Sequence, residues 1–270
     1  MDPIQGKELE LKVIRKLKDS KKWGDISTGY FYRDLLTEKP REIDIVADGI
    51  FGLNHGHSIQ VSLIFEVKYI TGKLTIWFDE AKKEDLIAFT KTNIVRDTSE
   101  AEILIQNSHF FNPAGSTPPV FAKTWFQNTP SKKEGFYDAV STLLSIFSSP
   151  SIKYQFKVKS QNNTKHLLIP IIAYQTENPI EFRNFDNNPI SPHKNFLLEA
   201  HHIYPLSSGN YLNEPSYISI WDIDEIDQNI SKLINEFSPD DRGGYSNNIA
   251  TSIIREFRND QPKTTPTTFR

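Results

Sequence analysis

The sequence contains no cysteine, so neither disulfide bonds nor thiolate metal sites contribute to this protein. It also lacks any apolar run near the roughly 20 residues that a membrane-spanning helix needs. The first residues, MDPIQGKELELK, are charged and contain no apolar stretch, which predicts the absence of a signal peptide. Together these absences favour a cytoplasmic protein with no membrane partner.

An excess of basic residues is absent too, because 31 Lys and Arg against 34 Asp and Glu give a formal net charge of −3. The chain as a whole therefore has no positive field that would indicate a nucleic-acid partner, although a local basic surface is compatible with this total. The 270 residues, of which 37% are hydrophobic and 12% aromatic, are enough for one large domain or two small ones with a packed core.

Two strands that carry charged residues are predicted on either side of a polar loop. The first strand, Glu42–Ala47, contains Asp44, and the second, Val61–Tyr69, contains Glu66 and Lys68. Because side chains alternate along a strand, Glu66 and Lys68 face the same way. The residues that alternate with them along the second strand face the other way, into apolar packing: Leu63, Phe65 and Val67.

Burying a carboxylate and an ammonium at the end of a hydrophobic strand is unfavourable, and a second carboxylate on the neighbouring strand adds to the cost. A cation between the carboxylates would offset that cost. Magnesium is the natural candidate, because it is a hard ion that takes oxygen ligands and keeps several waters.

Asp44 followed by Glu66-Val67-Lys68 resembles the signature of the PD-(D/E)xK nuclease superfamily, which has a restriction-endonuclease-like fold. The E-x-K half is intact, whereas Ile43 replaces the proline before Asp44. The resemblance implies an α/β fold with an αβββαβ core, in which helices flank a mixed central sheet. It also implies a metal-dependent deoxyribonuclease whose partner is nucleic acid, with DNA preferred.

The same resemblance implies the roles of the site residues. Asp44, Glu66 and Lys68 would be catalytic, and Glu8, Asp44 and Glu66 would bind Mg²⁺ or Mn²⁺, with the Val67 carbonyl as a further ligand. The metal would lower the pKa of a bound water, and Lys68 would position that water and stabilise the transition state. For Glu8, an exposed helix glutamate stays open as the other interpretation.

The order of predicted elements fits such a core within residues 1–175. A helix over 3–20 is predicted from Leu9, Val13 and Leu17, with Leu11 and Ile14 beside them. Glu8 is expected near the margin of this apolar arc, close to Leu11. Further predictions, in chain order, are a strand at Gly24–Asp34, a turn at Leu35–Arg41, a helix at Glu134–Ser148 and a buried strand at Leu167–Tyr174.

Residues 71–130 are expected to form an irregular insertion containing a short helix, Asp79–Lys91. Its aromatic residues alternate with lysines, so they could stack bases and hold phosphates, but we favour a packing role. Residues 176–258 are expected to form a C-terminal α/β extension packed on the core, and 259–270 a disordered tail. Its predicted elements are strands at Phe196–Ile203 and Tyr217–Trp221 and a helix at Asp222–Phe237.

Two histidine pairs suggest other metal sites. His55 and His57 form an H-x-H pair in a predicted loop, where solvated histidines are more common than zinc ligands. His201 and His202 resemble the opening of an HNH nuclease motif, but no histidine follows them to serve as the later metal ligand.

A metal-dependent endonuclease of a defence, repair or mobile-element system is the function that the sequence favours. The alternative is a catalytically silent nuclease-like module that binds nucleic acid or another protein. A homodimer, or a partner subunit that supplies DNA specificity, stays open, because the sequence contains no recognisable DNA-reading motif.

Overall fold

The computed structural model describes residues 3–33, 39–52, 58–80, 120–129, 135–148, 164–205 and 211–238. Its helices are α1 (Pro3–Asp19), α4 (Gly135–Ser148), η2 (Ile223–Glu225) and α6 (Ile226–Phe237). Its strands are β1 (Asp25–Arg33), β2 (Pro40–Gly52), β3 (Ser58–Ile70), β4 (Lys73–Glu80), β5 (Val120–Asn128), β6 (Thr164–Thr176), β7 (Glu181–Asn184), β8 (Asn195–Pro205) and β9 (Tyr211–Asp222).

The three α-helices form where apolar residues recur at helical spacing. In α1, Leu9, Val13 and Leu17 are buried, as their four-residue spacing predicts. The helices expected at 3–20, 134–148 and 222–237 are confirmed, apart from small differences at their ends. No helix among the described residues is long and apolar enough to cross a membrane.

All nine described strands belong to one mixed sheet, in the order β1-β2-β3-β6-β9-β8-β5-β4-β7. The hairpin β1–β2 and its neighbour β3 are antiparallel, whereas β6 runs parallel to β3 and β9 runs parallel to β6. The apolar strand β6 lies inside the sheet, as its almost continuous hydrophobic sequence predicts. The protein is therefore a mixed α/β fold.

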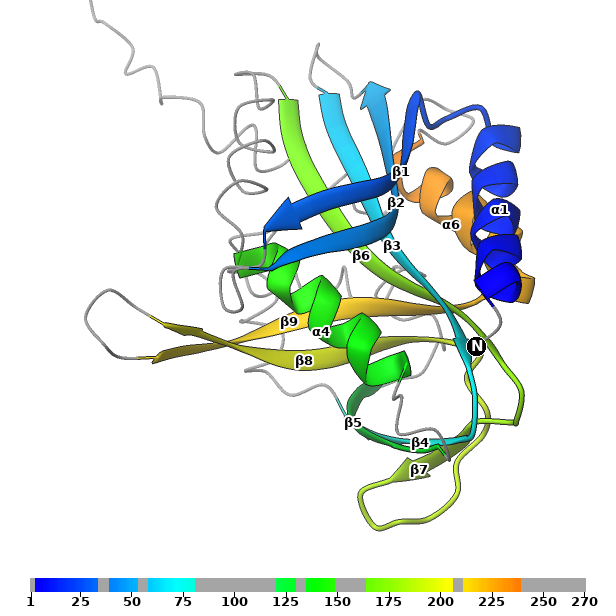
Figure 1. The fold of residues 1–270 in the computed structure, drawn as a ribbon, viewed down its shortest axis with the longest axis vertical. Coiled ribbons are helices and arrows are strands. Elements are labelled where there is room, and N and C mark those ends of the chain that lie inside the picture. The colour runs from blue at the N-terminus through cyan, green and yellow to red at the C-terminus, as the bar shows by residue number, and fades with distance from the viewer. Residues whose placement is uncertain are drawn as a thin grey trace, which may run out of the picture.

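Two apolar clusters cover the two faces of this sheet. One joins α1 and α6 to alternate residues of β2 and β3, including Ile45, Phe65 and Val67. The other joins α4 to residues of the opposite face, including Ile64 and Ile172. Figure 1 shows the strands bending around α4, while α1 and α6 lie together beyond β2 and β3.

The sheet is more extensive than the expected core. Two strands, β4 and β5, come from the region expected to be an irregular insertion, and they pair with each other in the sheet. Asp79 and Glu80 end β4 rather than begin a helix, and the rest of that predicted helix lies outside the described residues. Pro40 and Arg41 begin β2 rather than end a turn. From the expected C-terminal extension, β8 and β9 lie between β6 and β5.

The chain turns sharply between β3 and β4 at Gly72, whose φ is +79°. A Cβ atom at this position would lie 2.2 Å from the carbonyl oxygen of Asn128, so a side chain would clash with backbone. Both the backbone conformation and the close approach therefore require glycine here.

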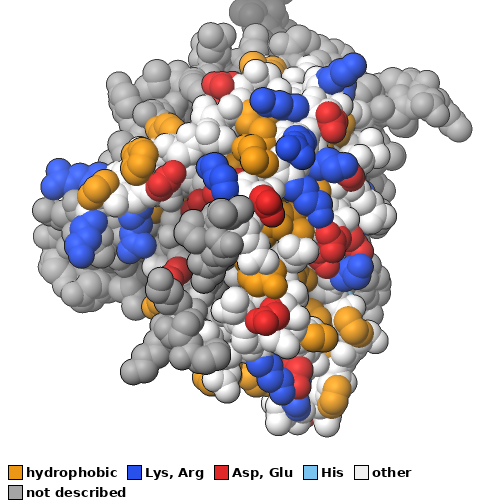
Figure 2. Space-filling view, turned by 45° about the vertical axis from the view of Figure 1, so that its right-hand side comes forward, with side chains coloured by type: hydrophobic (Ala, Val, Ile, Leu, Met, Phe, Trp, Pro, Cys, Tyr) orange, Lys and Arg blue, Asp and Glu red, His pale blue; other side chains and the backbone are white. Residues whose placement is uncertain are grey.

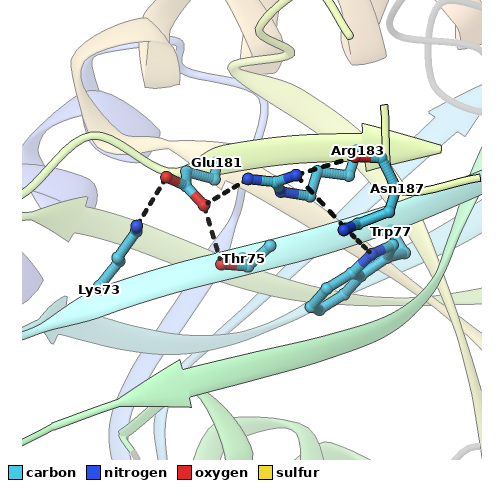
Figure 3. A network of polar contacts seen from close by, with 6 residues as sticks. All are labelled: Lys73, Thr75, Trp77, Glu181, Arg183 and Asn187. Atoms are coloured by element: carbon cyan, nitrogen blue, oxygen red, sulfur yellow. Dashed lines mark hydrogen bonds and ion pairs between the residues drawn. The ribbon is translucent and has the colours of Figure 1, made fainter. Parts of the chain in front are cut away.

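A polar network, shown in Figure 3, fastens the edge strand β7 to β4. Glu181 accepts from the Lys73 ammonium at 2.7 Å and from the Arg183 guanidinium at 3.5 Å. Arg183 also donates to the main-chain oxygen of Asn187 at 2.8 Å, which holds the turn after β7. Charged side chains at a sheet edge also disfavour pairing with a further strand.

Candidate functional site

The structure brings Asp44, Glu66 and Lys68 together. The Lys68 Nζ lies 2.8 Å from Glu66 Oε2 and 3.5 Å from Asp44 Oδ2, so one ammonium joins two carboxylates. Glu66 and Lys68 share a face of β3, as their spacing of two residues predicts. We call these three residues the Asp44 cluster.

The Asp44 cluster lies where β2 and β3 stop pairing. The last pair of their ladder is Ile45 with Phe65, and beyond it the Val67 N–H donates to Asp44 Oδ2 at 2.7 Å. The Asp44 side chain thus replaces the backbone partner that β2 no longer offers. Because the N–H and C=O of a strand residue point to the same side, the Val67 carbonyl also faces β2.

A bend in the β1–β2 hairpin produces this parting of the strands. Thr28 pairs with Ile45 and Tyr30 with Ile43, which leaves Gly29 opposite Asp44 with a φ of +63°. Ile43 and Ile45 would share a face on a flat strand, yet they belong to the clusters on opposite faces of the sheet. Asp44 therefore lies at the point where the strand rotates.

Glu66 is almost fully buried, with 2% of its surface exposed. The pKa of its carboxyl is raised to about 8, mainly by burial and also by the Asp44 carboxylate, although attraction to Lys68 and the smaller effect of the Asp44 N–H lower it. No donor among the described residues hydrogen-bonds to Glu66 Oε1. An unpartnered buried carboxylate oxygen is costly, which makes Glu66 a candidate functional residue.

Lys68 keeps its charge in this partly buried position. Burial alone would lower the pKa of Lys68, but attraction to Glu66 and Asp44 outweighs it and raises that pKa above its ordinary value. When both carboxylates are ionised, the Asp44 cluster carries one net negative charge, which a divalent cation would reverse. This charge balance is compatible with a further cation beside the cluster.

The structure does not bring Glu8 to the Asp44 cluster, because its side chain lies on the exposed face of α1. Among the described residues no three His, Asp or Glu side chains are grouped to hold a metal ion, so the predicted trio of Glu8, Asp44 and Glu66 is not assembled. Leu11, which we placed on the apolar arc beside Glu8, is 42% exposed. The apolar arc of α1 is therefore centred on Leu9, Val13 and Leu17 alone.

Glu10 and Lys7 are the α1 residues that sequence analysis missed. Their side chains form an ion pair of 2.5 Å, and Glu10 is the more buried of the two. The Glu10 contact raises the pKa of Lys7, and attraction to Asp44 and Glu42 adds to this effect. Lys7 therefore lies within Coulombic reach of the Asp44 cluster. The positions of Leu9, Val13 and Leu17 around the helix axis would have placed Glu10 nearer than Glu8 to the buried side of α1.

The other candidate residues belong to structural contacts or lie outside the described residues. His55 and His57 lie in the part of the chain that is not described. His201 Nε2 lies 3.2 Å from Glu199 Oε1, and Lys123 Nζ lies 2.6 Å from Glu199 Oε2. Of the aromatic residues in region 71–130, Phe78 and Phe121 are buried in the core, which agrees with a packing role, whereas Phe126 is 59% exposed.

The chain has no detectable likeness to characterised proteins. No family model, no curated protein and no solved structure matches it. The function must therefore be inferred from the Asp44 cluster itself.

Proposed function

We propose that this protein is a metal-dependent endonuclease that hydrolyses phosphodiester bonds of nucleic acid, with DNA as its substrate. The observation that carries this proposal is the buried Glu66 carboxylate, which has an unpartnered oxygen beside Asp44 and Lys68. Such a group is unfavourable in the free protein and becomes useful once a cation completes its contacts.

The donor set fits a hard divalent cation such as Mg²⁺ or Mn²⁺. Glu66 Oε1 has no hydrogen-bond partner among the described residues, the Asp44 carboxylate is partly exposed, and the Val67 carbonyl is on the same side of β3 as the Val67 N–H that contacts Asp44. A cation held by these oxygens would supply a more acidic bound water and neutralise charge on the phosphate.

The chain's own residues would position the substrate and balance the charge. Asp44 is oriented by the Val67 N–H, so its free carboxylate oxygen is directed by the backbone. The Lys68 ammonium, which joins the two carboxylates here, would stabilise negative charge as it develops on the phosphate. Glu66, held in an apolar layer, excludes water from one side of the cluster.

The element order supports a restriction-endonuclease-like core within the larger sheet. The sequence α1, β1, β2, β3, α4, β6 repeats the helix, three strands, helix and strand of that core, with β4 and β5 inserted before α4. The antiparallel β1–β2–β3 unit and the parallel pairing of β3 with β6 agree with this proposal.

A catalytically silent module is the second candidate, and the Lys68 contacts favour it. Lys68 bridges both carboxylates, so the Asp44 cluster is partly neutralised without a metal. In that case the cluster would be an internal ion pair, and the protein would bind nucleic acid or a partner without cleaving it.

Cleavage assays separate the two candidates. Supercoiled plasmid and linear single-stranded DNA are incubated with the parent protein in Mg²⁺, in Mn²⁺ and in EDTA. We expect nicking in Mg²⁺ or Mn²⁺ only, and its loss in Glu66→Gln, which preserves side-chain size. Glu199→Gln, another buried glutamate, is the control and should nick as the parent does. Nicking that persists in Glu66→Gln would contradict the proposed site, and absence of nicking in the parent would support the silent module.

A further inference from the structure

One exposed side of α1 carries a row of basic residues. Lys7, Arg15 and Lys18 are eight and three residues apart, which places them on one side of the helix at about 100° per residue. All three are exposed. Figure 2 shows Lys and Arg side chains gathered over this part of the molecule. We call these three residues the α1 basic row.

The other lysines of α1 serve a different purpose. Lys12 Nζ lies 2.7 Å from Asp224 Oδ1, and Lys16 Nζ lies 2.6 Å from Asp227 Oδ2, so both fasten α1 to the η2–α6 segment. Arg15 and Lys18 form no ion pair within the described part of the chain. The charges of the α1 basic row are therefore not required to hold the helix in place.

The α1 basic row begins within electrostatic range of the Asp44 cluster. Lys7 is its first member, its ammonium pairs with Glu10 at 2.5 Å, and the Asp44 charge contributes to raising its pKa. The row extends from there by eleven residues, or about 16 Å at 1.5 Å per residue. That length corresponds to about five nucleotide steps of a strand at 3.4 Å each.

Relying on the proposed function, we propose that the α1 basic row binds the sugar–phosphate backbone of nucleic acid and leads the strand to the Asp44 cluster. The chain has a net charge of −3, and the cluster is acidic, so the unassisted approach of a phosphate is repelled. Three exposed cations in line, the first of them within electrostatic range of Asp44, would offset that repulsion along the path of the substrate.

Binding measured against salt concentration tests this proposal. The triple variant Lys7→Ala, Arg15→Ala, Lys18→Ala is compared with the parent, using a fluorescent duplex of about 20 base pairs in EDTA at increasing NaCl. Each lost phosphate contact lowers the slope of log Kd against log salt by about 0.9, so we expect a decrease of about 2 to 3. In Mg²⁺ the same variant should show a raised KM with little change in kcat.

A matched variant controls for the change in net charge. Lys73→Ala, Lys194→Ala, Lys232→Ala removes three lysines from other parts of the molecule. Lys73 resembles Lys7 closely, because each side chain is 59% exposed and each pairs with one glutamate. This control should keep the parental slope and KM. The charge-preserving variant Lys7→Arg, Arg15→Lys, Lys18→Arg should keep them too, which separates charge from any loss of helix stability.

Two results would overturn the proposal. If the parent cleaves DNA but both alanine triples have the same slope, the α1 basic row is not the binding surface, and the proposed function stands. If the parent neither binds nor cleaves nucleic acid, the proposed function and this inference fail together. Should the α1 alanine triple fail to fold, as judged by circular dichroism, Lys7→Ala alone compared with Lys73→Ala decides the matter by the same slope and KM.

Discussion

Two lysine–glutamate pairs with a buried glutamate lie within the described sheet, and they differ in whether the second carboxylate oxygen has a partner. Lys68 and Glu66 are 2.8 Å apart on β3, and Lys123 and Glu199 are 2.6 Å apart between β5 and β8. Both glutamate side chains are buried, at 3% and 8% exposure. As ion pairs the two sites are nearly equivalent.

The second oxygen of each carboxylate separates the two pairs. Glu199 Oε1 lies 3.2 Å from the His201 ring nitrogen, so both of its oxygens have partners. Glu66 Oε1 has none within the described residues, and a second carboxylate, Asp44, lies beside it. A satisfied buried pair can be purely structural, whereas one with a spare oxygen and excess negative charge is suited to bind a cation.

The largest difference between the two pairs should appear in catalysis. Lys68→Met should reduce plasmid nicking by about 100- to 1000-fold, because it removes a group oriented to stabilise charge at the phosphate. Lys123→Met should leave nicking close to the parental rate. Single-turnover rates measured at saturating Mg²⁺ give both values. Equal losses in the two variants would show that the pairs do not differ in function.

For the free energy of unfolding we expect the larger loss at the Lys123–Glu199 pair and the smaller loss at the Lys68–Glu66 pair. Glu199→Ala leaves Lys123 buried without its carboxylate and should lower the free energy of unfolding by about 3 kcal/mol. Glu66→Gln replaces a carboxyl that is largely protonated near pH 7 with a neutral amide of the same size, and Lys68 retains Asp44, so we expect a change of less than about 1 kcal/mol. Urea denaturation without metal measures both. A larger loss of stability for Glu66→Gln would mean that Glu66, and not Glu199, has the structural role.

The pH dependence of stability should also distinguish Glu66. Its pKa is about 8 in the folded protein and near 4.5 when unfolded, so the folded state binds the extra proton between these values. The contribution of Glu66 to the free energy of unfolding is therefore greatest below pH 4.5 and falls as the pH rises to about 8. We expect a fall on the order of 4 kcal/mol in the parent that Glu66→Gln lacks. Parallel curves for the two proteins from about pH 5 to about pH 8 would contradict this prediction.

A smaller effect is expected at Asp44. Asp44→Ala leaves the Val67 N–H without its acceptor and should lower the free energy of unfolding by about 1 kcal/mol, even though it relieves repulsion with Glu66. Asp44→Asn keeps an acceptor oxygen and should be close to neutral. Thermal denaturation of both variants in EDTA measures the difference. If the alanine variant is more stable than the parent, carboxylate repulsion outweighs the lost hydrogen bond.

Local patterns in the sequence were sufficient to predict the elements of the site. The alternation around Glu66 and Lys68 predicts their shared face, and the four-residue spacing of Leu9, Val13 and Leu17 predicts α1. The almost continuous apolar run of β6 predicts a strand buried inside the sheet. Each of these signals depends on residues that are close in the chain.

Long-range pairing and breaks in periodicity could not be predicted in this way. The strands β4 and β5 are separated by 39 residues, and nothing local indicates that they pair. At Asp44, the left-handed conformation of Gly29 on the neighbouring strand bends β2, which a pattern of alternation does not include. On α1, counting Leu11 as a core residue moved the expected apolar arc toward Glu8 and away from Glu10.

Calorimetric titration with Mn²⁺ tests the central claim, that Glu66 and Asp44 form a cation site, most directly. Near pH 7 the Glu66 carboxyl, with its pKa of about 8, must lose its proton when a cation binds. Titration in two buffers with different ionisation enthalpies should therefore show release of nearly one proton per Mn²⁺ bound by the parent. Binding should be lost in Glu66→Gln and retained in Glu199→Gln. Equal Mn²⁺ affinity in the parent and in Glu66→Gln, without proton release, would contradict the account.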